Sequence, residues 1–459
     1  MEVFAADGVR PLNITNTSNR LIASAVRHAI EPTLASLITH EQRGFLKDRV
    51  MLANLVDVDE GLLRMAATHS SAYGVFLDLL AAFPSVEQLF LHVYFRALGW
   101  APWLCRLVSN LFWRNFCSIS ISGILCMGFA ISRGIRQGCP LSPLLFAVIS
   151  ELLLRRIRRF LPLSLRRAYA DDLAVLVHNG ATCLPILAVI FGDYALISGL
   201  QLSIAKTVLV PLFPYNHLDF FAQLAQLVPT WAGVKVDDKA KYLGFWLGPG
   251  KGEVSWEAPC AKALSRAITW GRAGLGLNMS LRAYSVYMVS VLLYVAQLER
   301  LPSDWSQREA TLVRRLFPGP MWWIKADILH NTTVLGYKWN LPKLQHLSLA
   351  VMHRVYHTAD WRNGGLRVAA RARQLRHTLQ VNPDLDQWQW LLGWQQRGFL
   401  FQLESSQREF QQAVSATLQR NTLSERYETW ARTLRVDNET AMTAQVQSIA
   451  HSVFQQVSQ

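Results

Sequence analysis

The hydrophobic residues of the chain follow two patterns, which together predict a mixed helix and strand protein. Residues 73–80 are apolar apart from Asp78, and residues 166–177 contain two apolar runs that meet at a polar turn. Continuous apolar runs of this length are typical of buried strands. Apolar residues spaced by three and four predict helices from Pro84 through Leu98, over residues 142–159 and over residues 183–200.

The second half of the chain has helical patterns only, over residues 261–272, 280–298 and 308–316. A Pro- and Gly-rich stretch at residues 249–252 indicates a linker. We therefore predict three parts: residues 1–250 of mixed structure, residues 251–340 of helices, and residues 341–459 of basic, Trp- and Gln-rich helices. Trp388, Trp390 and Trp394 fit either a core or a base-stacking platform, and the burial of aromatic residues favours the core.

Composition and charge narrow the class of protein. The 459 residues are 51% hydrophobic and 17% charged, which is typical of a folded chain. A net charge of +14 fits a polyphosphate-binding surface, and acidic lipid is the alternative partner. The six cysteines form no Cys-x-x-Cys pair, and the N-terminus has no secretion signal. We expect a nuclear or cytoplasmic protein that is neither secreted nor bound to a membrane.

Two adjacent carboxylates, Asp171 and Asp172, interrupt the apolar pattern where one strand would reverse into the next. Like charges at such a place repel each other and lose hydration unless a cation compensates them. Mg²⁺ suits the site, because it takes one or two protein carboxylates and completes its shell with water and phosphates. A polar hairpin turn is the alternative, since Asp is common in turns.

The neighbouring motifs decide between these alternatives. The box YADD at 169–172 is similar to the catalytic box of reverse transcriptases, and four further boxes of that family follow its order. They are VFLDLLAAF at 75–83, GIRQGCPLSPLLF at 134–146, GLQLSIAKT at 199–207 and YLGF at 242–245. The residues in these boxes resemble those of non-LTR (LINE-type) retrotransposon enzymes, and the resemblance extends from about residue 10 to residue 248.

The resemblance implies an α+β right-hand polymerase fold, with fingers, a palm built on an antiparallel sheet, and a helical thumb. Residues 1–250 would form the fingers and palm, residues 251–340 the thumb, and residues 341–459 a helical C-terminal region. The implied activity is RNA-directed DNA polymerisation. Its implied partners are an RNA template, a DNA primer and deoxynucleoside triphosphates.

The resemblance also implies the roles of individual residues. Two Mg²⁺ ions, or Mn²⁺ in their place, would be held by Asp78, the Leu79 carbonyl, Asp171 and Asp172. Lys206 would lie near the leaving pyrophosphate. The implied nucleotide-binding residues are Arg10, Arg49, Phe83, Gln137 and Gly138, and the implied primer grip is Leu243 and Gly244. Taken singly, each Arg also fits a solvated surface charge, Phe83 a core side chain and Gln137 a loop hydrogen bond.

Three positions depart from the family pattern. Asp48 stands where Gly is usual, Pro84 where Asp is common, and Ser203 where Asn is usual. The chain also has no region that resembles an upstream endonuclease, so we expect it to be part of a larger element protein. These features allow an alternative hypothesis, a degenerate copy that binds RNA without polymerising. The presence of all three carboxylates favours the enzyme.

Overall fold

The computed structural model describes residues 15–112, 115–319, 324–332, 337–358, 368–381, 391 and 393–420. The chain divides into two compact units, Met1–Leu243 and Gly244–Gln459. This boundary lies close to the one predicted at residue 250. The further division predicted at residue 340 stays a prediction.

The first unit contains most of the strands. Its elements in chain order are α1 (Thr17–Leu37), α2 (Met51–Thr68), β1 (Tyr73–Leu77), α3 (Ala82–Ser85), α4 (Gln88–Ala97), α5 (Pro102–Phe112), β2 (Asn115–Ile121), β3 (Ile124–Ile131), α6 (Ser142–Phe160), β4 (Leu165–Tyr169), β5 (Asp172–Val177), α7 (Gly180–Ser198), η2 (Ile204–Lys206), β6 (Val208–Pro211), α8 (His217–Leu227), η3 (Pro229–Trp231), β7 (Lys235–Val236) and β8 (Ala240–Tyr242).

A five-stranded sheet in the order β4-β5-β1-β6-β7 forms the centre of this unit. The pairs β4·β5, β5·β1 and β1·β6 are antiparallel, and β6·β7 is parallel. All five residues of β1 are buried, which explains why this strand is a continuous apolar run. The predicted antiparallel sheet is therefore present, with β1 in the middle.

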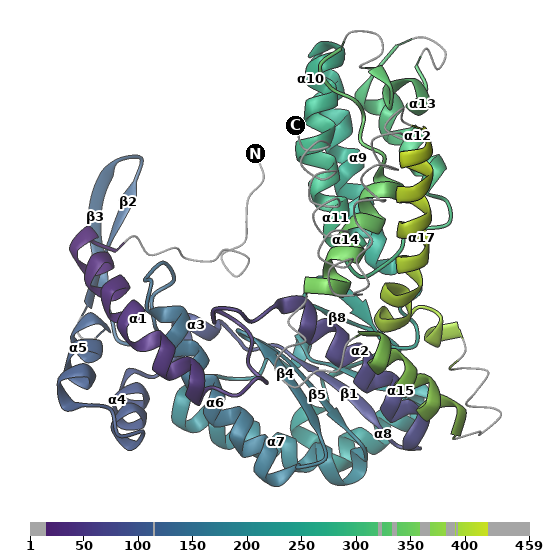
Figure 1. Ribbon diagram of the computed structural model, residues 1–459. Helices are drawn as coiled ribbons and strands as arrows, with labels where there is room; N and C mark the ends of the chain where they lie inside the picture. The colour runs from purple at the N-terminus through teal and green to yellow at the C-terminus, as the bar shows by residue number, and fades with distance from the viewer. Residues whose placement is uncertain are drawn as a thin grey trace, which may run out of the picture. The chain divides into compact units, whose positions relative to one another are not determined.

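Helices cover both faces of the sheet. Helices α6 and α7 lie beneath it in Figure 1, and their apolar residues form one core with Val75 and Leu77 of β1. Helix α2 packs on the opposite face, where a Cβ on Gly74 would come within 2.7 Å of the Leu62 side chain. The sheet is thus covered on both faces by helices.

The predicted helices are confirmed with shifted ends. Helix α6 begins at Ser142 and α7 begins at Gly180, three residues before the predicted start. Helix α7 ends at Ser198, and the residue that caps it, Gly199, has a φ of 76°. The helix predicted from Pro84 is wrong in detail, because it is two helices, α3 and α4, separated at Val86 and Glu87. Hydrogen bonds from Glu87 N–H to the Ser198 carbonyl and from Gly134 N–H to the Val86 carbonyl hold this break open.

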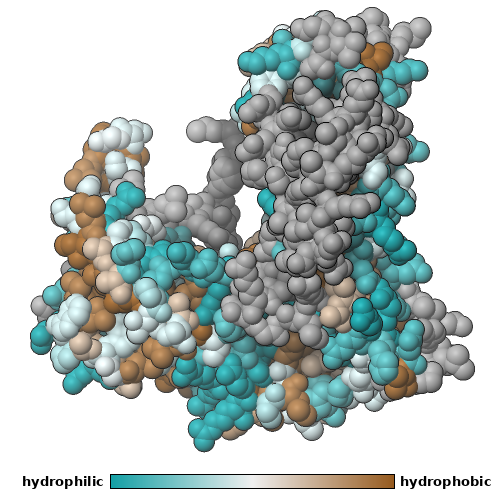
Figure 2. Space-filling model, viewed as in Figure 1, coloured by the Kyte–Doolittle hydropathy of each residue, from teal (hydrophilic) through white to brown (hydrophobic). Residues whose placement is uncertain are grey.

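Strands β2 and β3 form a hairpin that contains no charged residue and exposes many apolar side chains. Ile124, Leu125 and Met127 are 70%, 72% and 93% exposed. Figure 2 shows hydrophobic residues gathered on this part of the surface and along α1. The hairpin therefore offers no positive charge for a phosphate backbone.

The second unit is almost entirely helical, as its sequence pattern predicts. Its elements are β9 (Phe245–Leu247), η4 (Val254–Trp256), α9 (Glu257–Arg272), α10 (Gly276–Ala283), the π-helix η5 (Tyr284–Val289), α11 (Ser290–Ala296), α12 (Trp305–Leu316), α13 (Ala326–Leu329), α14 (Leu344–Thr358), α15 (Val368–Val381) and α17 (Phe399–Arg420). Trp394 is buried, in agreement with a core role, and Trp388 and Trp390 lie outside the described residues.

Two helical segments, Gly180–Ser198 and Gly276–Ala296, are long and apolar enough to cross a membrane by length and composition alone. Helix α7, the first of them, packs against α4, α6 and α8 and contributes Leu187 and Ile190 to the core. Core helices of soluble proteins have the same composition. The predicted absence of a membrane partner stays a prediction.

Candidate active site

Strand pairing brings Asp78 next to the pair of carboxylates in the YADD box. In the register of β1 against β5, Leu77 lies opposite Leu173. The next residues outward along the two strands are Asp78 and Asp172, and Asp171 lies in the turn between β4 and β5. The three carboxylates that the sequence predicts to act together therefore lie at the same end of the sheet.

Asp78 is more exposed than its sequence neighbours suggest. Its position after an apolar run predicts a side chain that points toward the core, but the side chain is 33% exposed. The reason is that β1 ends at Leu77 and the chain turns away, with Ser203 N–H donating to the Asp78 carbonyl at 2.8 Å. Asp78 thus faces the strand end, where a ligand can reach it.

The turn between β4 and β5 is strained. Tyr169 pairs with Asp172, so the loop has two residues, Ala170 and Asp171. Ala170 has a φ of 58°, in the left-handed region that Gly adopts most easily at this place of a hairpin. A non-glycine residue there costs about 1 to 3 kcal/mol unless the surrounding structure compensates.

Lys206 lies beside the first carboxylate. Its Nζ is 3.6 Å from Asp78 Oδ2, and its side chain is 72% exposed. The short helix η2, which ends at Lys206, directs it to this end of the sheet. The predicted role at the pyrophosphate stays a prediction, and the structure adds an ion pair with Asp78.

Tyr242 is the last residue of β8. It lies next to the site, on the face of the sheet against which β8 packs. Its hydroxyl donates to the Arg167 carbonyl at 3.2 Å, and its ring lies 5.8 Å from the ring of Phe76. Burial, together with the nearby negative charge of Asp172, raises the pKa of Tyr242. The Tyr242 hydroxyl therefore stays neutral, and the buried side chain packs beside Asp172.

The predicted primer-grip residues follow Tyr242 directly. Leu243 and Gly244 have φ values of 47° and 85°. Two successive left-handed residues make a tight turn, in which only Gly244 is free of steric cost. Their contact with a primer stays a prediction.

In the box at residues 134–146, the backbone of a glycine lies close to another segment of the chain. Gly134 has a φ of 90°, and a Cβ there would lie 2.7 Å from the Pro84 carbonyl oxygen. Gly138 has a φ of 105° and is followed by α6. Ser142 is the first helical residue of α6 and is fully buried. Gln137 lies half-buried in the turn before α6, and its role stays a prediction.

Phe83 lies in a group of aromatic rings beside the site. Its ring stacks on Phe146 of α6 at 4.9 Å between centroids and meets Phe45 edge-on at 5.9 Å. The side chain is half-buried, so one part of it packs and another part remains accessible. This placement fits both the predicted sugar contact and the alternative core role.

The guanidinium of Arg49 donates hydrogen bonds to four backbone carbonyls. It donates to the carbonyls of Ala35 and Ile38 at 2.7 Å, of Thr39 at 2.5 Å and of Gln42 at 2.7 Å. Arg49 thus fastens the end of α1 to the loop that follows, a role that the sequence did not predict. Its predicted contact with the nucleotide stays a prediction, and Arg10 lies outside the described residues.

Asp48, the departure from the family glycine, has a φ of 62°. This is the left-handed conformation that glycine adopts without strain, and Asp is among the few other residues that tolerate it. The loop shape is therefore compatible with the substitution.

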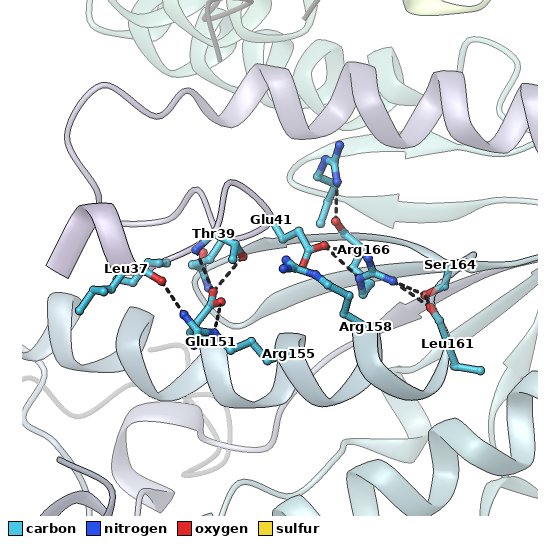
Figure 3. A network of polar contacts seen from close by, with 12 residues as sticks. Leu37, Thr39, Glu41, Glu151, Arg155, Arg158, Leu161, Ser164 and Arg166 are labelled. Atoms are coloured by element: carbon cyan, nitrogen blue, oxygen red, sulfur yellow. Dashed lines mark hydrogen bonds and ion pairs between the residues drawn. The ribbon is translucent and has the colours of Figure 1, made fainter. Parts of the chain in front are cut away.

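The loop from Thr39 to Gly44 is tied to the sheet and to α6 by charged groups (Figure 3). Glu41 Oε1 accepts from Arg166 of β4, and Glu41 Oε2 pairs with Arg158 of α6 at 2.8 Å. Glu151 accepts from Thr39 N–H at 3.1 Å and from the Thr39 hydroxyl at 2.9 Å. Through these contacts, charged side chains of α6 and β4 bind the loop.

The donor set fits a hard divalent cation bound together with its substrate. Among the described residues, no group of three or more His, Cys, Asp or Glu side chains converges as a closed metal site. Mg²⁺ does not need one, because it binds through one or two carboxylates and takes its other ligands from water and phosphates. Asp78 and Asp171, at neighbouring strand ends, match this requirement.

The chain has a distant likeness to solved structures of telomerase. Apo telomerase from Candida tropicalis has a TM-score of 0.40 at 12% identity, covering 81% of this chain and 61% of that chain. The same telomerase in complex with a fragment of telomeric RNA has a TM-score of 0.40 at 10% identity, covering 82% and 57%. These likenesses are too distant to support a conclusion about this chain.

Two curated proteins are similar in sequence. The uncharacterized 149 kDa protein of transposon TX1 from Xenopus laevis is 26% identical over 179 residues, which cover 37% of this chain and 14% of that protein. The Pol polyprotein of the type-2 retrotransposable element R2DM from Drosophila melanogaster is 30% identical over 171 residues, which cover 36% and 16%. The chain therefore spans less than a fifth of either relative.

The family profile of reverse transcriptases (RNA-dependent DNA polymerases) matches residues 5–247. This range contains all three carboxylates, the five boxes and the whole central sheet. Its retrotransposon relatives agree with the resemblance of the boxes to non-LTR enzymes. The chain belongs to the reverse transcriptase family.

Proposed function

We propose that this chain is an RNA-directed DNA polymerase, which adds deoxynucleotides to the 3′-hydroxyl of a DNA primer on an RNA template. The observation that carries the proposal is the placement of Asp78, Asp171 and Asp172 at one end of the sheet by the strand register. In this proposal the first unit contains the fingers and palm, residues 251–340 form the thumb, and residues 341–459 form a separate helical C-terminal region. Membership of the family implies a right-hand polymerase fold of this kind.

Asp78 and Asp171 would hold two Mg²⁺ ions, or Mn²⁺ in their place, with help from Asp172 and the Leu79 carbonyl. When bound, the metal would lower the pKa of the primer hydroxyl and neutralise charge on the triphosphate. Reverse transcriptases use divalent metal ions as a family.

The side chains around the carboxylates would position the substrate, which is the main task of a protein in phosphoryl transfer. The amide of Gln137 would hold the nucleotide, and Phe83 would exclude a 2′-hydroxyl from the space beneath the sugar. The exposed Nζ of Lys206 would give a proton to the leaving pyrophosphate. Leu243 and Gly244 would approach the primer backbone.

The excess of positive charge supports nucleic acid as the partner, since Lys and Arg displace condensed counterions from phosphates. We also propose that the protein works inside the cell, in the nucleus or cytoplasm. All six cysteines are free thiols, which fits a reducing compartment.

Extension of a DNA primer on an RNA template tests the proposal. Asp78→Asn and Asp171→Asn keep the size of the side chain but remove a charge, so extension should be lost while primer-template affinity stays within a few-fold. Asp193→Asn is the matched control, because Asp193 lies on the surface of α7 in an ion pair with Arg156 at 2.5 Å. Binding without extension by the unmodified chain would instead support the degenerate copy.

A further inference from the structure

The strained turn that carries Asp171 lies at the edge of the sheet, because β4 is an edge strand. The hairpin partner β5 supports it from one side only. Residues in an unfavourable backbone conformation persist where the surrounding structure fixes them from several directions. The left-handed conformation of Ala170 therefore needs a second support from outside the hairpin.

Gln42 provides this support. Its side-chain Oε1 accepts from Ala170 N–H at 3.0 Å, and its Nε2 donates to the Ala170 carbonyl at 3.2 Å. One amide group thus binds both polar atoms of the residue that precedes Asp171. Gln42 is completely buried, so water cannot replace these bonds.

The amide of Gln42 is itself fixed in place. Its Oε1 also accepts from Gly44 N–H at 2.8 Å, and its Nε2 also donates to the Ser150 hydroxyl of α6 at 2.9 Å. The backbone beside it is bound to β4, since Arg43 N–H donates to the Ala168 carbonyl at 2.9 Å and Ala168 N–H to the Glu41 carbonyl at 2.7 Å. The ion pairs of Glu41 in Figure 3 anchor the same segment to α6 and β4.

We infer that Gln42 is a positioning residue for the catalytic carboxylates, which acts by fixing the backbone of Ala170 and thereby the direction of Asp171. The inference rests on the proposed polymerase function. It requires a side chain with one donor and one acceptor at the same end. Gln supplies both, whereas Glu lacks the N–H donor and Met lacks both groups.

The decisive variant is Gln42→Met, which keeps the length of the side chain and removes its hydrogen bonds. Gln402→Met is the matched control, because Gln402 in α17 is also buried and binds backbone through both ends of its amide. Its Nε2 donates to the Arg397 carbonyl at 2.8 Å, and its Oε1 accepts from Arg300 N–H at 2.8 Å. The control therefore loses equivalent bonds within the second unit.

The first measurement is hydrogen exchange of the Ala170 amide in the metal-free protein. Gln42→Met should speed this exchange at least about tenfold, since the amide loses its acceptor. Gln402→Met should leave it unchanged. This measurement needs no polymerase activity, so it tests the contact even if the unmodified chain fails to extend primers.

The second measurement is single-nucleotide addition on a primed RNA template at varied Mg²⁺. Gln42→Met should lower kcat by about tenfold to a hundredfold, the range expected for a displacement near 1 Å, and should raise the Mg²⁺ concentration for half-maximal rate. The KM for the nucleotide should stay within a few-fold, because Gln42 is completely buried. Normal kcat and Mg²⁺ dependence in a folded Gln42→Met protein would overturn the inference.

Ser150→Ala covers the case in which Gln42→Met does not fold. It removes one bond that holds the Gln42 amide but leaves both bonds to Ala170 in place. Exchange of the Ala170 amide should then rise by a few-fold, with a smaller fall in kcat. An unchanged exchange rate and an unchanged kcat in Ser150→Ala would likewise count against Gln42.

Discussion

Gly44 packs so closely against the turn that carries Asp171 that any side chain at this position would clash with the turn. A Cβ at this position would lie 2.2 Å from the Ala170 nitrogen and 3.0 Å from both Ala170 Cα and Gln42 Oε1. Two of these three atoms belong to backbone, which cannot rotate away as a flexible side chain can. Gly44→Ala should therefore move the turn that carries Asp171.

The structure sets the size of the effect. Ordinary van der Waals contact begins at 3.4 Å, so the loop and the turn must separate by about 1 Å to admit the methyl group. Overpacking of this kind costs about 1 to 3 kcal/mol of stability. A displacement of about 1 Å at a catalytic group can lower the rate by about a hundredfold. We expect both effects, with activity affected more than folding.

The assay compares Gly44→Ala with Gly192→Ala, which makes the same chemical change in α7, where no atom lies within 4 Å of the new Cβ. Denaturant unfolding should show a loss for Gly44→Ala and a gain of about 0.5 to 1 kcal/mol for Gly192→Ala. Primer extension under saturating nucleotide should be slow only for Gly44→Ala. Extension at the normal rate by a folded Gly44→Ala protein would refute the tight coupling of this loop to the turn.

Three further predictions concern charge, sugar choice and pH. Affinity for a primed RNA template should fall steeply between about 50 and 200 mM salt, and a flat response in a binding titration would contradict the interpretation of the +14 charge. Phe83→Val should raise ribonucleotide insertion relative to deoxyribonucleotide insertion in single-nucleotide kinetics; an unchanged ratio in an active variant would make Phe83 a core residue only. Burial raises the pKa of Glu309 in α12 to about 7 from 4.5 in the unfolded chain, so its contribution to stability should be lost as pH rises through this window. Unfolding midpoints between pH 4.5 and 7 should show this loss for the unmodified protein and not for Glu309→Gln.

The sequence alone determined strands β1, β4 and β5, helices α6 and α7, and the three carboxylates. These features depend on local patterns: β1 is buried on both faces and so is continuously apolar, and a two-residue hairpin needs its polar residues at the turn. The family boxes then assigned chemistry to Asp78, Asp171 and Asp172, which the strand register places at one end of the sheet. The ends of α6 and α7 were close for the same reason, since caps and periodicity are local.

Tertiary structure decided the features that depend on partners distant in the chain. The break between α3 and α4 exists because Ser198 and Gly134 bind the backbone at Val86 and Glu87, which no local pattern reveals. Arg49 was predicted to meet the nucleotide, and only the fold showed four backbone carbonyls around its guanidinium.

The same holds for the support of the catalytic turn. Gln42 and Ala170 are 128 residues apart, and in the sequence Gln42 is one polar residue in a loop. The strain at Ala170 is also invisible in the sequence, because alanine has no special preference for a positive φ. The left-handed conformation of Ala170 and its hydrogen bonds to Gln42 both arise from tertiary packing. Only the folded chain therefore shows that the turn requires this side chain.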